Sequence, residues 1–294
     1  MIEGEQSEWT TRRGQPELRT LAVRSFGLTD SGKVRSANED HFLIAELTKA
    51  MHIERTSLPQ ASAQFGQERG RIFLVADGMG GHQGGQEASA LAIASIEKFA
   101  LNTLKWFFPL KGSETQTVAD ELQTALRQAD ATIVEEAAQR PELRGMGTTL
   151  TMAYSLDSEL FVVHVGDSRA YVYRDGELHQ VTQDHTLVAE MVKRGEVTPE
   201  KAAKHRLRHV ITNVIGGAEE GVRVEAHKLD LQAGDRILLC TDGLTEMLSN
   251  DQIATVLATE SDPEQACKRL VAQANEHGGC DNITVILAQF SDAE

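Results

Sequence analysis

The sequence predicts an α+β protein in which antiparallel sheets stack face to face and helices cover their outer sides. Three observations support this fold class. Two long helical patterns, 86–107 and 117–139, follow the first strands. A block of strands with short connections comes next, which favours antiparallel pairing because a parallel connection needs about a dozen residues or more. Two further helices and a closing strand end the chain, so strands and helices do not alternate as in a doubly wound sheet.

The N-terminal part contains strands separated by polar segments. Residues 1–19 carry no hydrophobic periodicity and are expected to form a flexible tail, so that a single domain would span 20–294. Strands are expected at 21–28 and 41–47. The pattern is lost over 48–70, where we expect a surface insertion, since loops of this length are usually functional or disordered.

The two helical patterns place apolar residues on one face, and each is followed by a proline. Pro109 and Pro141 come after the first and the second helix. Proline lacks the N–H group that a continuing helix needs, so these positions predict the helix ends.

The C-terminal part is predicted to be rich in strands. We expect strands at 147–154, 159–165, 169–173, 222–229, 235–240 and 283–290, and helices at 251–258 and 263–276. The Asp175-Gly176 dipeptide predicts a hairpin turn. The basic and partly helical segment 185–221, called the flap below, is expected to be a small subdomain inserted between strands.

Composition excludes several classes of partner. The formal net charge of -15 argues against binding to nucleic acid or to an anionic membrane. The N-terminus is polar and no apolar run reaches the length of a membrane span. Three cysteines without regular spacing do not form a disulfide framework, which suits a reducing compartment. We therefore expect a cytoplasmic protein, and a monomer.

Three carboxylates share one sequence context. Asp77 and Asp242 each follow a buried apolar strand and precede glycine, and Asp281 precedes Asn282 and the last strand. Strand ends can meet at a sheet edge, where carboxylates repel one another unless a cation neutralises them. Ligand sets made of oxygen alone favour Mg²⁺ or Mn²⁺ over zinc. Two such ions can activate a water for attack on a phosphoryl group.

Other residues supply the remaining chemistry of phosphate-ester hydrolysis. Arg35 is a candidate phosphate clamp, because a guanidinium binds phosphate oxygens in a bidentate manner. We expect Glu39 and Asp40 to hold metal-bound waters. Glu39 is assigned to the metal site and Asp40 to the catalytic residues. An exposed charged turn is the alternative for this segment. His82 is the candidate general acid, and a surface histidine at a helix start is its alternative.

Rival chemistries lack their required residues. A cysteine phosphatase needs Cys-x5-Arg, and none of the cysteines has arginine at that spacing. His205 and His209 are spaced like a metalloprotease pair, but Arg206 occupies the place of the required glutamate. We interpret both histidines as basic flap residues. No phosphate-binding loop of the GxxxxGK[ST] type occurs.

The motifs together resemble a known family. They are RSANED from Arg35, ADGMGGH from Ala76, GTT from Gly147, GDSR from Gly166, TDG from Thr241 and DN from Asp281. Their order is that of the metal-dependent protein phosphatases of type 2C, and the resemblance covers 21–290. It implies a four-layer α/β/β/α sandwich with a dinuclear Mn²⁺ or Mg²⁺ site. It also implies hydrolysis of phosphoserine and phosphothreonine in proteins. We expect these proteins to be substrates of a serine/threonine kinase.

The resemblance also assigns roles to individual residues. Asp77 would bridge both metals, Gly78 would offer its carbonyl, and Asp242 and Asp281 would complete the pair. Asp167 would bind a third, weaker metal beside the flap, although an ordinary turn residue is the alternative. Glu246 lies four residues after Asp242, which on a helix returns to the same face, so it can supply a second carboxylate to that ion.

One position departs from many eukaryotic members, which have histidine where this chain has Met79. The histidine at 82 instead matches bacterial members of the DGMGGH type and favours a bacterial single-domain enzyme. A non-catalytic relative that only binds phosphoproteins is the second hypothesis. It predicts that one of the metal carboxylates is lost, whereas all of them are present.

Overall fold

The central strands of the protein are apolar on both faces because each lies between two layers. The computed structural model describes residues 21–51, 64–80, 84–102, 115–202, 204–217 and 221–293. In β3 (Gln64–Met79), Ile72 and Leu74 pack beneath helices, while Phe73 and Val75 pack against the other sheet. Burial of both faces explains why this strand is a continuous apolar run instead of an alternating one.

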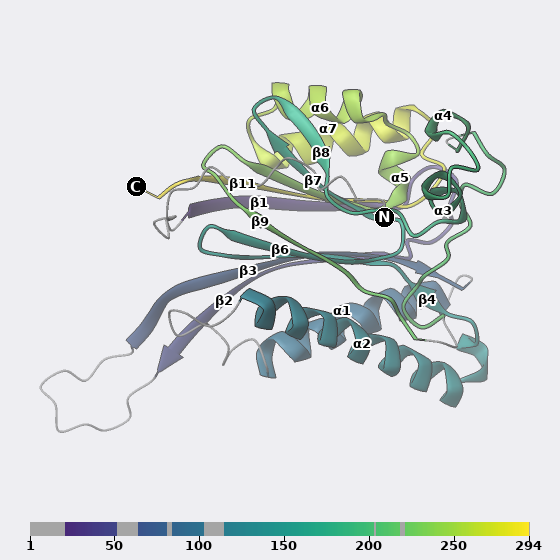
Figure 1. Ribbon diagram of the computed structural model, residues 1–294, viewed down its shortest axis with the longest axis horizontal. Helices are drawn as coiled ribbons and strands as arrows, with labels where there is room; N and C mark the ends of the chain where they lie inside the picture. The colour runs from purple at the N-terminus through teal and green to yellow at the C-terminus, as the bar shows by residue number, and fades with distance from the viewer. Residues whose placement is uncertain are drawn as a thin grey trace, which may run out of the picture.

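Two antiparallel sheets form the middle of the molecule (Figure 1). One has the strand order β2-β3-β5-β6-β9, with β4 paired to β3, and consists of β2 (Asp40–Met51), β3, β4 (Gly147–Thr148), β5 (Leu150–Leu156), β6 (Glu159–Val165) and β9 (Glu225–Asp230). The other has the order β1-β11-β10-β7-β8 and consists of β1 (Leu21–Asp30), β7 (Arg169–Arg174), β8 (Glu177–Gln180), β10 (Arg236–Cys240) and β11 (Ile283–Asp292).

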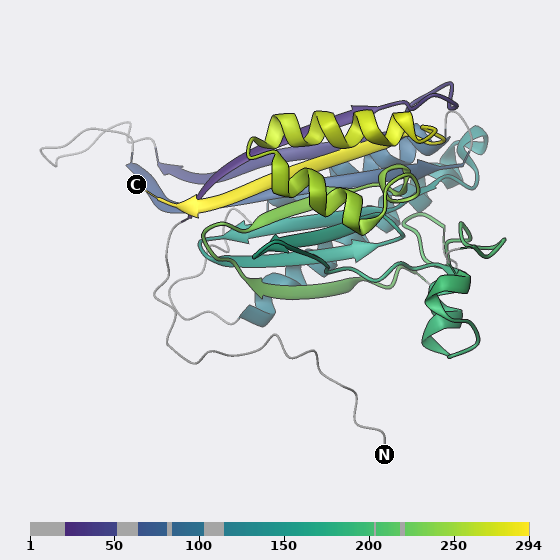
Figure 2. The same ribbon diagram turned by 90° about the horizontal axis from the view of Figure 1, so that it is seen from above.

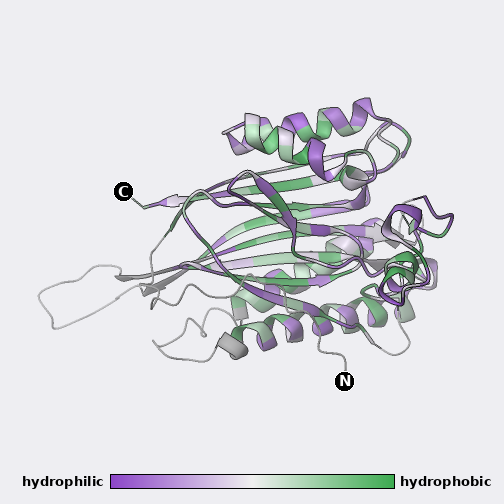
Figure 3. Cartoon of the chain, turned by 45° about the horizontal axis from the view of Figure 1, so that its top comes forward, coloured by the Kyte–Doolittle hydropathy of each residue, from purple (hydrophilic) through white to green (hydrophobic). Residues whose placement is uncertain are grey.

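Helices cover the outer face of each sheet. The six-stranded sheet is covered by α1 (Gly84–Asn102) and α2 (Thr115–Gln139), and the five-stranded sheet by α6 (Asn250–Thr259) and α7 (Pro263–Glu276), as Figure 2 shows from above. The apolar sides of these helices face the sheets (Figure 3). The α+β class and the four-layer α/β/β/α sandwich are thus confirmed.

Three apolar layers hold the sandwich together, one between the sheets and one beneath each helix pair. Phe73 and Phe290 are fully buried in the layer between the sheets. Truncating a buried phenylalanine to alanine typically costs about 3–5 kcal/mol of stability, because transfer free energy is lost and a cavity remains. This packing fixes where the strand ends lie.

The connection between β6 and β7 corrects one expectation from the sequence. The short spacing favoured antiparallel pairing of these strands, but β6 pairs with β5 and β9, whereas β7 pairs with β8 and β10. Gly166, Asp167 and Ser168 therefore carry the chain from one sheet to the other. The Asp175-Gly176 hairpin turn between β7 and β8 is confirmed.

The predicted insertion at 48–70 is shorter than expected. β2 and β3 continue as a paired ladder into this segment, with Thr48 opposite Arg69 and Ala50 opposite Phe65 across an irregular register. Backbone pairing does not require apolar side chains, so the sequence pattern missed it. The part at 52–63, the predicted tail 1–19 and the predicted helix end at 103–107 lie outside the described residues.

The flap lies at one end of the sheets, beside α5 (Asp242–Thr245). It contains α3 (Leu187–Lys193) and α4 (Pro199–Ala202). The bridge Thr186–Ile211 joins two parts of the flap, and the bridge Thr148–Ile215 fastens the flap to the body (Figure 1). Among the helices described, none is long and apolar enough to cross a membrane.

Candidate metal centre

Carboxylates from separate parts of the chain converge at the flap end of the two sheets. Asp77 is paired directly with Asp40 across β3 and β2. Burial raises the pKa of Asp77 well above its usual value, and the charges of Asp40, Asp242, Asp167 and Asp281 raise it further. The three strand-end carboxylates predicted from the sequence are therefore neighbours in the fold.

The backbone of Asp77 is fixed by the GTT segment. The Asp77 N–H group donates to Thr149 Oγ1 at 3.1 Å, and the Asp77 carbonyl accepts from the Thr149 N–H group at 2.9 Å. The Thr148 hydroxyl donates to the same carbonyl at 2.8 Å. Two threonine hydroxyls thus hold the main chain at the position that carries the central carboxylate.

Gly78 lies where only glycine fits. A Cβ at this position would lie 2.0 Å from the Gly85 carbonyl oxygen and 2.8 Å from the Glu39 carbonyl oxygen. The Gly78 N–H group donates to the Glu39 carbonyl at 3.2 Å. A Cβ at Gly85 would lie 2.2 Å from Glu39 Oε2, so the start of α1 packs against the Glu39 carboxylate. Glycine here allows β3, α1 and Glu39 to approach closely.

Asp40 is buried, which contradicts the alternative of an exposed charged turn at this residue. The residue is 4% exposed, and Oδ2 accepts a hydrogen bond from Thr241 Oγ1 at 2.8 Å. Oδ1 is buried and has no hydrogen-bond partner among the described residues. Burial raises the pKa of Asp40 to about 7, against the opposing effect of the threonine hydroxyls at 284 and 241.

Arg35 reaches the carboxylate cluster through an ion pair. Its Nη2 donates to Asp281 Oδ2 at 2.6 Å, and this hydrogen bond raises the pKa of Arg35. The Asn282 N–H group donates to Asp281 Oδ1 at 2.8 Å. The Arg35 side chain remains 57% exposed, so its positively charged guanidinium lies at the open side of the carboxylate cluster.

Asn282 organises the turn that presents Arg35, a role that the sequence did not reveal beyond the DN motif. Its Nδ2 donates to the carbonyls of Ser31 and Ala37 at 3.1 and 2.9 Å. Its Oδ1 accepts from the Glu39 N–H group at 2.8 Å. One buried amide side chain therefore joins the last strand to the segment that carries Arg35 and Glu39.

Asp242 and Glu246 lie on the same side of a helical turn, as their spacing predicted. The Glu246 N–H group donates to the Asp242 carbonyl at 2.8 Å. Ligand atoms of His209, Asp242 and Glu246 all lie within 4.8 Å of one another, and His209 is ion-paired with Glu246. The sequence pattern indicates for His209 only a basic residue of the flap. The structure adds it to the carboxylate cluster, through a long-range contact that no local pattern signals.

Asp167 is buried at the crossover between the sheets, and within the part of the chain that the structure describes its Oδ1 lacks a hydrogen-bond partner. Burial raises its pKa to about 7, and the nearby Asp184 raises it further. Asp167, Asp242 and Glu246 line one part of a groove of about 1250 Å³ between the flap and α5. The position differs from an ordinary hairpin turn, which would be exposed.

The donor set fits hard divalent cations. Among the residues that the structure describes, buried carboxylate oxygens without hydrogen-bond partners occur at Asp40, Asp167 and Asp242, three of the clustered acids. Unpaired buried carboxylates are costly unless they are protonated or bound to a cation. Oxygen donors in this number suit Mg²⁺ and Mn²⁺. His82, the predicted general acid, lies outside the described residues, so its role stays a prediction.

A four-layer sandwich with a carboxylate cluster at one end of its sheets is the architecture of the metal-dependent protein phosphatases. Residues 49–277 match the family model described as protein phosphatase 2C. This match spans most of the chain. The chain belongs to the protein phosphatase 2C family.

Curated relatives carry consistent names. The serine/threonine protein phosphatase PstP of Mycobacterium tuberculosis is 35% identical over 276 residues, covering 93% of this chain and 46% of the relative. This chain therefore spans about half the length of that protein. The serine/threonine phosphatase stp of Listeria monocytogenes is 32% identical over 265 residues, covering 89% of this chain and 93% of the relative.

Solved structures give the same family. A crystal structure of the Mycobacterium tuberculosis phosphatase PstP/Ppp superposes with a TM-score of 0.73 at 33% identity, covering 92% of this chain and 99% of that chain. The PstP catalytic domain in complex with two manganese ions superposes with a TM-score of 0.72 at 34% identity, covering 93% of this chain and all of that one.

Proposed function

We propose that this chain is a metal-dependent serine/threonine protein phosphatase that hydrolyses phosphoserine and phosphothreonine in proteins. The observation that carries the proposal is the convergence of Asp77, Asp242 and Asp281 on one site, with Arg35 ion-paired to the last of them. The names of the relatives and the manganese complex of PstP support the same reaction.

We propose that the carboxylates hold two Mn²⁺ or Mg²⁺ ions. When bound, such ions activate water as a nucleophile and neutralise the charge of the phosphoryl group. Asp77, Asp242 and Asp281 and the Gly78 carbonyl would be the ligands of this pair, with Glu39 and Asp40 orienting the waters around it. Asp167 and Glu246 would hold a third, weaker ion at the groove.

Arg35 would bind the phosphate group of the substrate. Its ion pair with Asp281 uses Nη2, and the side chain is largely exposed. A guanidinium has five N–H donors in a planar fork, so donors beyond Nη2 can reach phosphate oxygens. The Asp281 contact orients this fork beside the carboxylate cluster before the substrate arrives.

His82 would give a proton to the departing serine or threonine oxygen. An alkoxide is a poor leaving group, and an imidazole with a pKa near neutrality can protonate it during bond cleavage.

We also propose that 20–294 is one catalytic domain with 185–221 as its flap. We further propose that the chain is a cytoplasmic monomer and that a serine/threonine kinase phosphorylates its substrates.

Phosphate release from a phosphothreonine peptide, with and without manganese, tests the proposal. We expect release that requires manganese, stops on chelation and returns when the metal is restored. A non-catalytic phosphoprotein-binding relative would bind the peptide without releasing phosphate. The presence of all the predicted metal carboxylates favours hydrolysis. Peptide binding with no phosphate release at saturating manganese or magnesium would support the binding protein instead.

A further inference from the structure

The loop that carries Asp167 is held by a histidine from the base of the flap. The His185 N–H group donates to the Gly166 carbonyl at 2.7 Å, and the Gly166 N–H group donates to His185 Nδ1 at 3.0 Å. Gly166 is the residue directly before Asp167. The side chain and the backbone of His185 therefore fix both backbone polar groups of Gly166, next to a proposed metal ligand.

The same ring nitrogen also contacts the C-terminal side of the flap base. Asn213 Nδ2 lies 2.9 Å from His185 Nδ1, and the Thr212 N–H group donates to the His185 carbonyl at 2.8 Å. Asn213 is itself fixed, because its Nδ2 donates to the Arg223 carbonyl and its Oδ1 accepts from the Arg223 N–H group. His185 Nδ1 thus lies between the Asp167 loop and the base of the flap.

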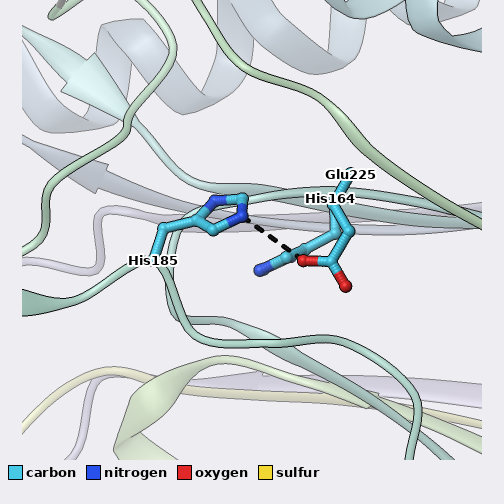
Figure 4. A group of neighbouring side chains, drawn as sticks. All are labelled: His164, His185 and Glu225. Atoms are coloured by element: carbon cyan, nitrogen blue, oxygen red, sulfur yellow. Dashed lines mark ion pairs between the residues drawn. The ribbon is translucent and has the colours of Figure 1, made fainter. Parts of the chain in front are cut away.

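These contacts define the tautomer of His185. Two N–H groups point at Nδ1, so this nitrogen must be the unprotonated acceptor. The proton of the neutral ring then lies on Nε2, which faces Glu225 Oε2 at 3.3 Å (Figure 4). Glu225, on β9, therefore orients the ring and keeps Nδ1 available as an acceptor.

His164 completes the arrangement and argues against a separate metal site here. Ligand atoms of His164, His185 and Glu225 lie within 4.8 Å of one another. However, His164 Nδ1 lies 2.8 Å from Thr151 Oγ1, and its Nε2 lies 3.0 Å from the Gly166 carbonyl oxygen. Burial lowers the pKa of His164 to about 4, so the ring is neutral. Both of its nitrogens are occupied by hydrogen bonds.

The loop has little freedom to move away from these contacts. Gly166 has φ +113, and a Cβ there would lie 2.5 Å from the Thr149 side chain. At the other end of the loop, Arg169 forms a two-point ion pair with Asp184, the residue before His185, at 2.8 and 2.6 Å. Asp184 and His185 therefore hold both ends of the loop.

We propose that His185 is a positioning residue for the proposed phosphatase reaction. Its Nδ1 acceptor holds Gly166 and Asn213 together, and so sets Asp167 and the flap in one arrangement around the groove. The proposal rests on the proposed function for its effect on turnover. The link between His185, the loop and the flap base can be tested on the metal-free protein alone.

Substitution of His185 by asparagine or by glutamine distinguishes the hydrogen-bonding role of Nδ1 from mere filling of space by the ring. In His185→Asn, the side-chain oxygen can take the place of Nδ1 and accept from Gly166 and Asn213. In His185→Gln, the amide reaches the position of Nε2 and leaves no acceptor at Nδ1. We expect His185→Gln and His185→Ala to lower kcat on a phosphothreonine peptide by about 10- to 100-fold, as for residues behind metal ligands, with KM little changed. His185→Asn should recover most of this loss.

Amide hydrogen exchange provides the readout that does not depend on turnover. In metal-free His185→Gln, segments 164–169 and 209–215 should exchange faster than in the wild type, with α1 and α2 unchanged. His277→Gln, an exposed histidine after α7, is the matched control and should change neither exchange nor kcat. If the wild type releases no phosphate, the proposed function fails, but the exchange comparison still decides the link.

Asn213→Asp tests the same link if His185 variants fold poorly. The aspartate keeps an acceptor for the Arg223 N–H group but cannot donate to His185 Nδ1 or to the Arg223 carbonyl. It should give the same exchange pattern and the same loss in kcat. The inference is overturned if His185→Gln keeps wild-type kcat and exchange, if His185→Asn is as impaired as His185→Ala, or if exchange rises equally throughout the protein.

Discussion

Asp40 and Asp77 occupy directly paired positions on the antiparallel strands β2 and β3. Like charges placed opposite each other in a ladder are destabilising. The charges of four further acids, Glu39, Asp167, Asp242 and Asp281, also act on one or both of these buried carboxyl groups. The fold therefore maintains a concentration of negative charge that only protons or cations can relieve.

The metal-free protein should lose stability as the pH rises. Burial raises the pKa of both Asp40 and Asp167 to about 7 from a usual value of 3.8. A raised carboxyl pKa means that the folded state holds the proton more tightly. Its stabilising effect is complete below the unfolded value and is lost as the pH rises through the folded value.

Thermal unfolding of the chelated protein at about pH 5 and about pH 8 measures this effect. One pKa unit corresponds to about 1.4 kcal/mol, so the loss should be on the order of a few kcal/mol. Asp40→Asn keeps the acceptor for Thr241 and should reduce the difference, and added manganese should raise Tm at the higher pH. An unchanged or higher Tm at about pH 8 without metal would contradict this prediction.

Asp167→Ala should keep two tightly bound metals but lose most turnover on phosphopeptides. The buried Oδ1 of Asp167 has no hydrogen-bond partner in the described part of the chain, and Asp167 lines the groove. It therefore suits an ion with few protein ligands, which binds weakly. We expect the loss in kcat and not in peptide affinity. Calorimetric metal titration beside kinetics measures both. Asp175→Asn, in the turn between β7 and β8, is the matched control, and loss of the tight ions in Asp167→Ala would refute the assignment.

His82→Ala should distinguish substrates by their leaving groups. An aryl oxide departs with little protonation, whereas the threonine alkoxide needs a general acid, whose contribution is typically about 10²–10⁴-fold. The variant should therefore slow hydrolysis of phosphothreonine far more than hydrolysis of an activated aryl phosphate. Equal losses on the two substrates would assign His82 a structural role.

Replacing the cysteines should leave hydrolysis intact. Cys240 and Cys267 are buried in the apolar layer beneath α6 and α7, while Cys280 is exposed. Burial raises the pKa of both buried thiols to about 12, so neither supplies a thiolate at neutral pH. A triple alanine variant should retain kcat while losing on the order of 1 kcal/mol of stability for each buried site. Loss of turnover in a folded variant would contradict this expectation.

Local sequence patterns predicted the elements whose burial is evident from the residue types of a short segment. The strands before Asp77 and Asp242 are apolar on both faces because they lie between two packed layers. Glu246 was predicted to accompany Asp242 because one helical turn determines their separation. Each of these inferences needed only the periodicity of a single element.

The remaining features depend on contacts between distant segments. The short link at Gly166 resembles a hairpin, and its passage between the sheets depends on a positive φ and on packing against Thr149. His209 reaches Glu246 only because the flap folds back over α5. The role of His185 likewise arises from residues far apart in the chain, with Asn213 on the other side of the flap. No local periodicity carries such information.

Replacement of Asp77 tests the central claim most directly. The measurement is manganese-dependent phosphate release by Asp77→Ala beside the wild type, with circular dichroism and thermal unfolding confirming the fold. Loss of the ligand should abolish turnover at every manganese concentration, while the metal-free variant should be at least as stable as the wild type because a repelling charge is removed. Full manganese-dependent turnover by a folded Asp77→Ala protein would contradict the account.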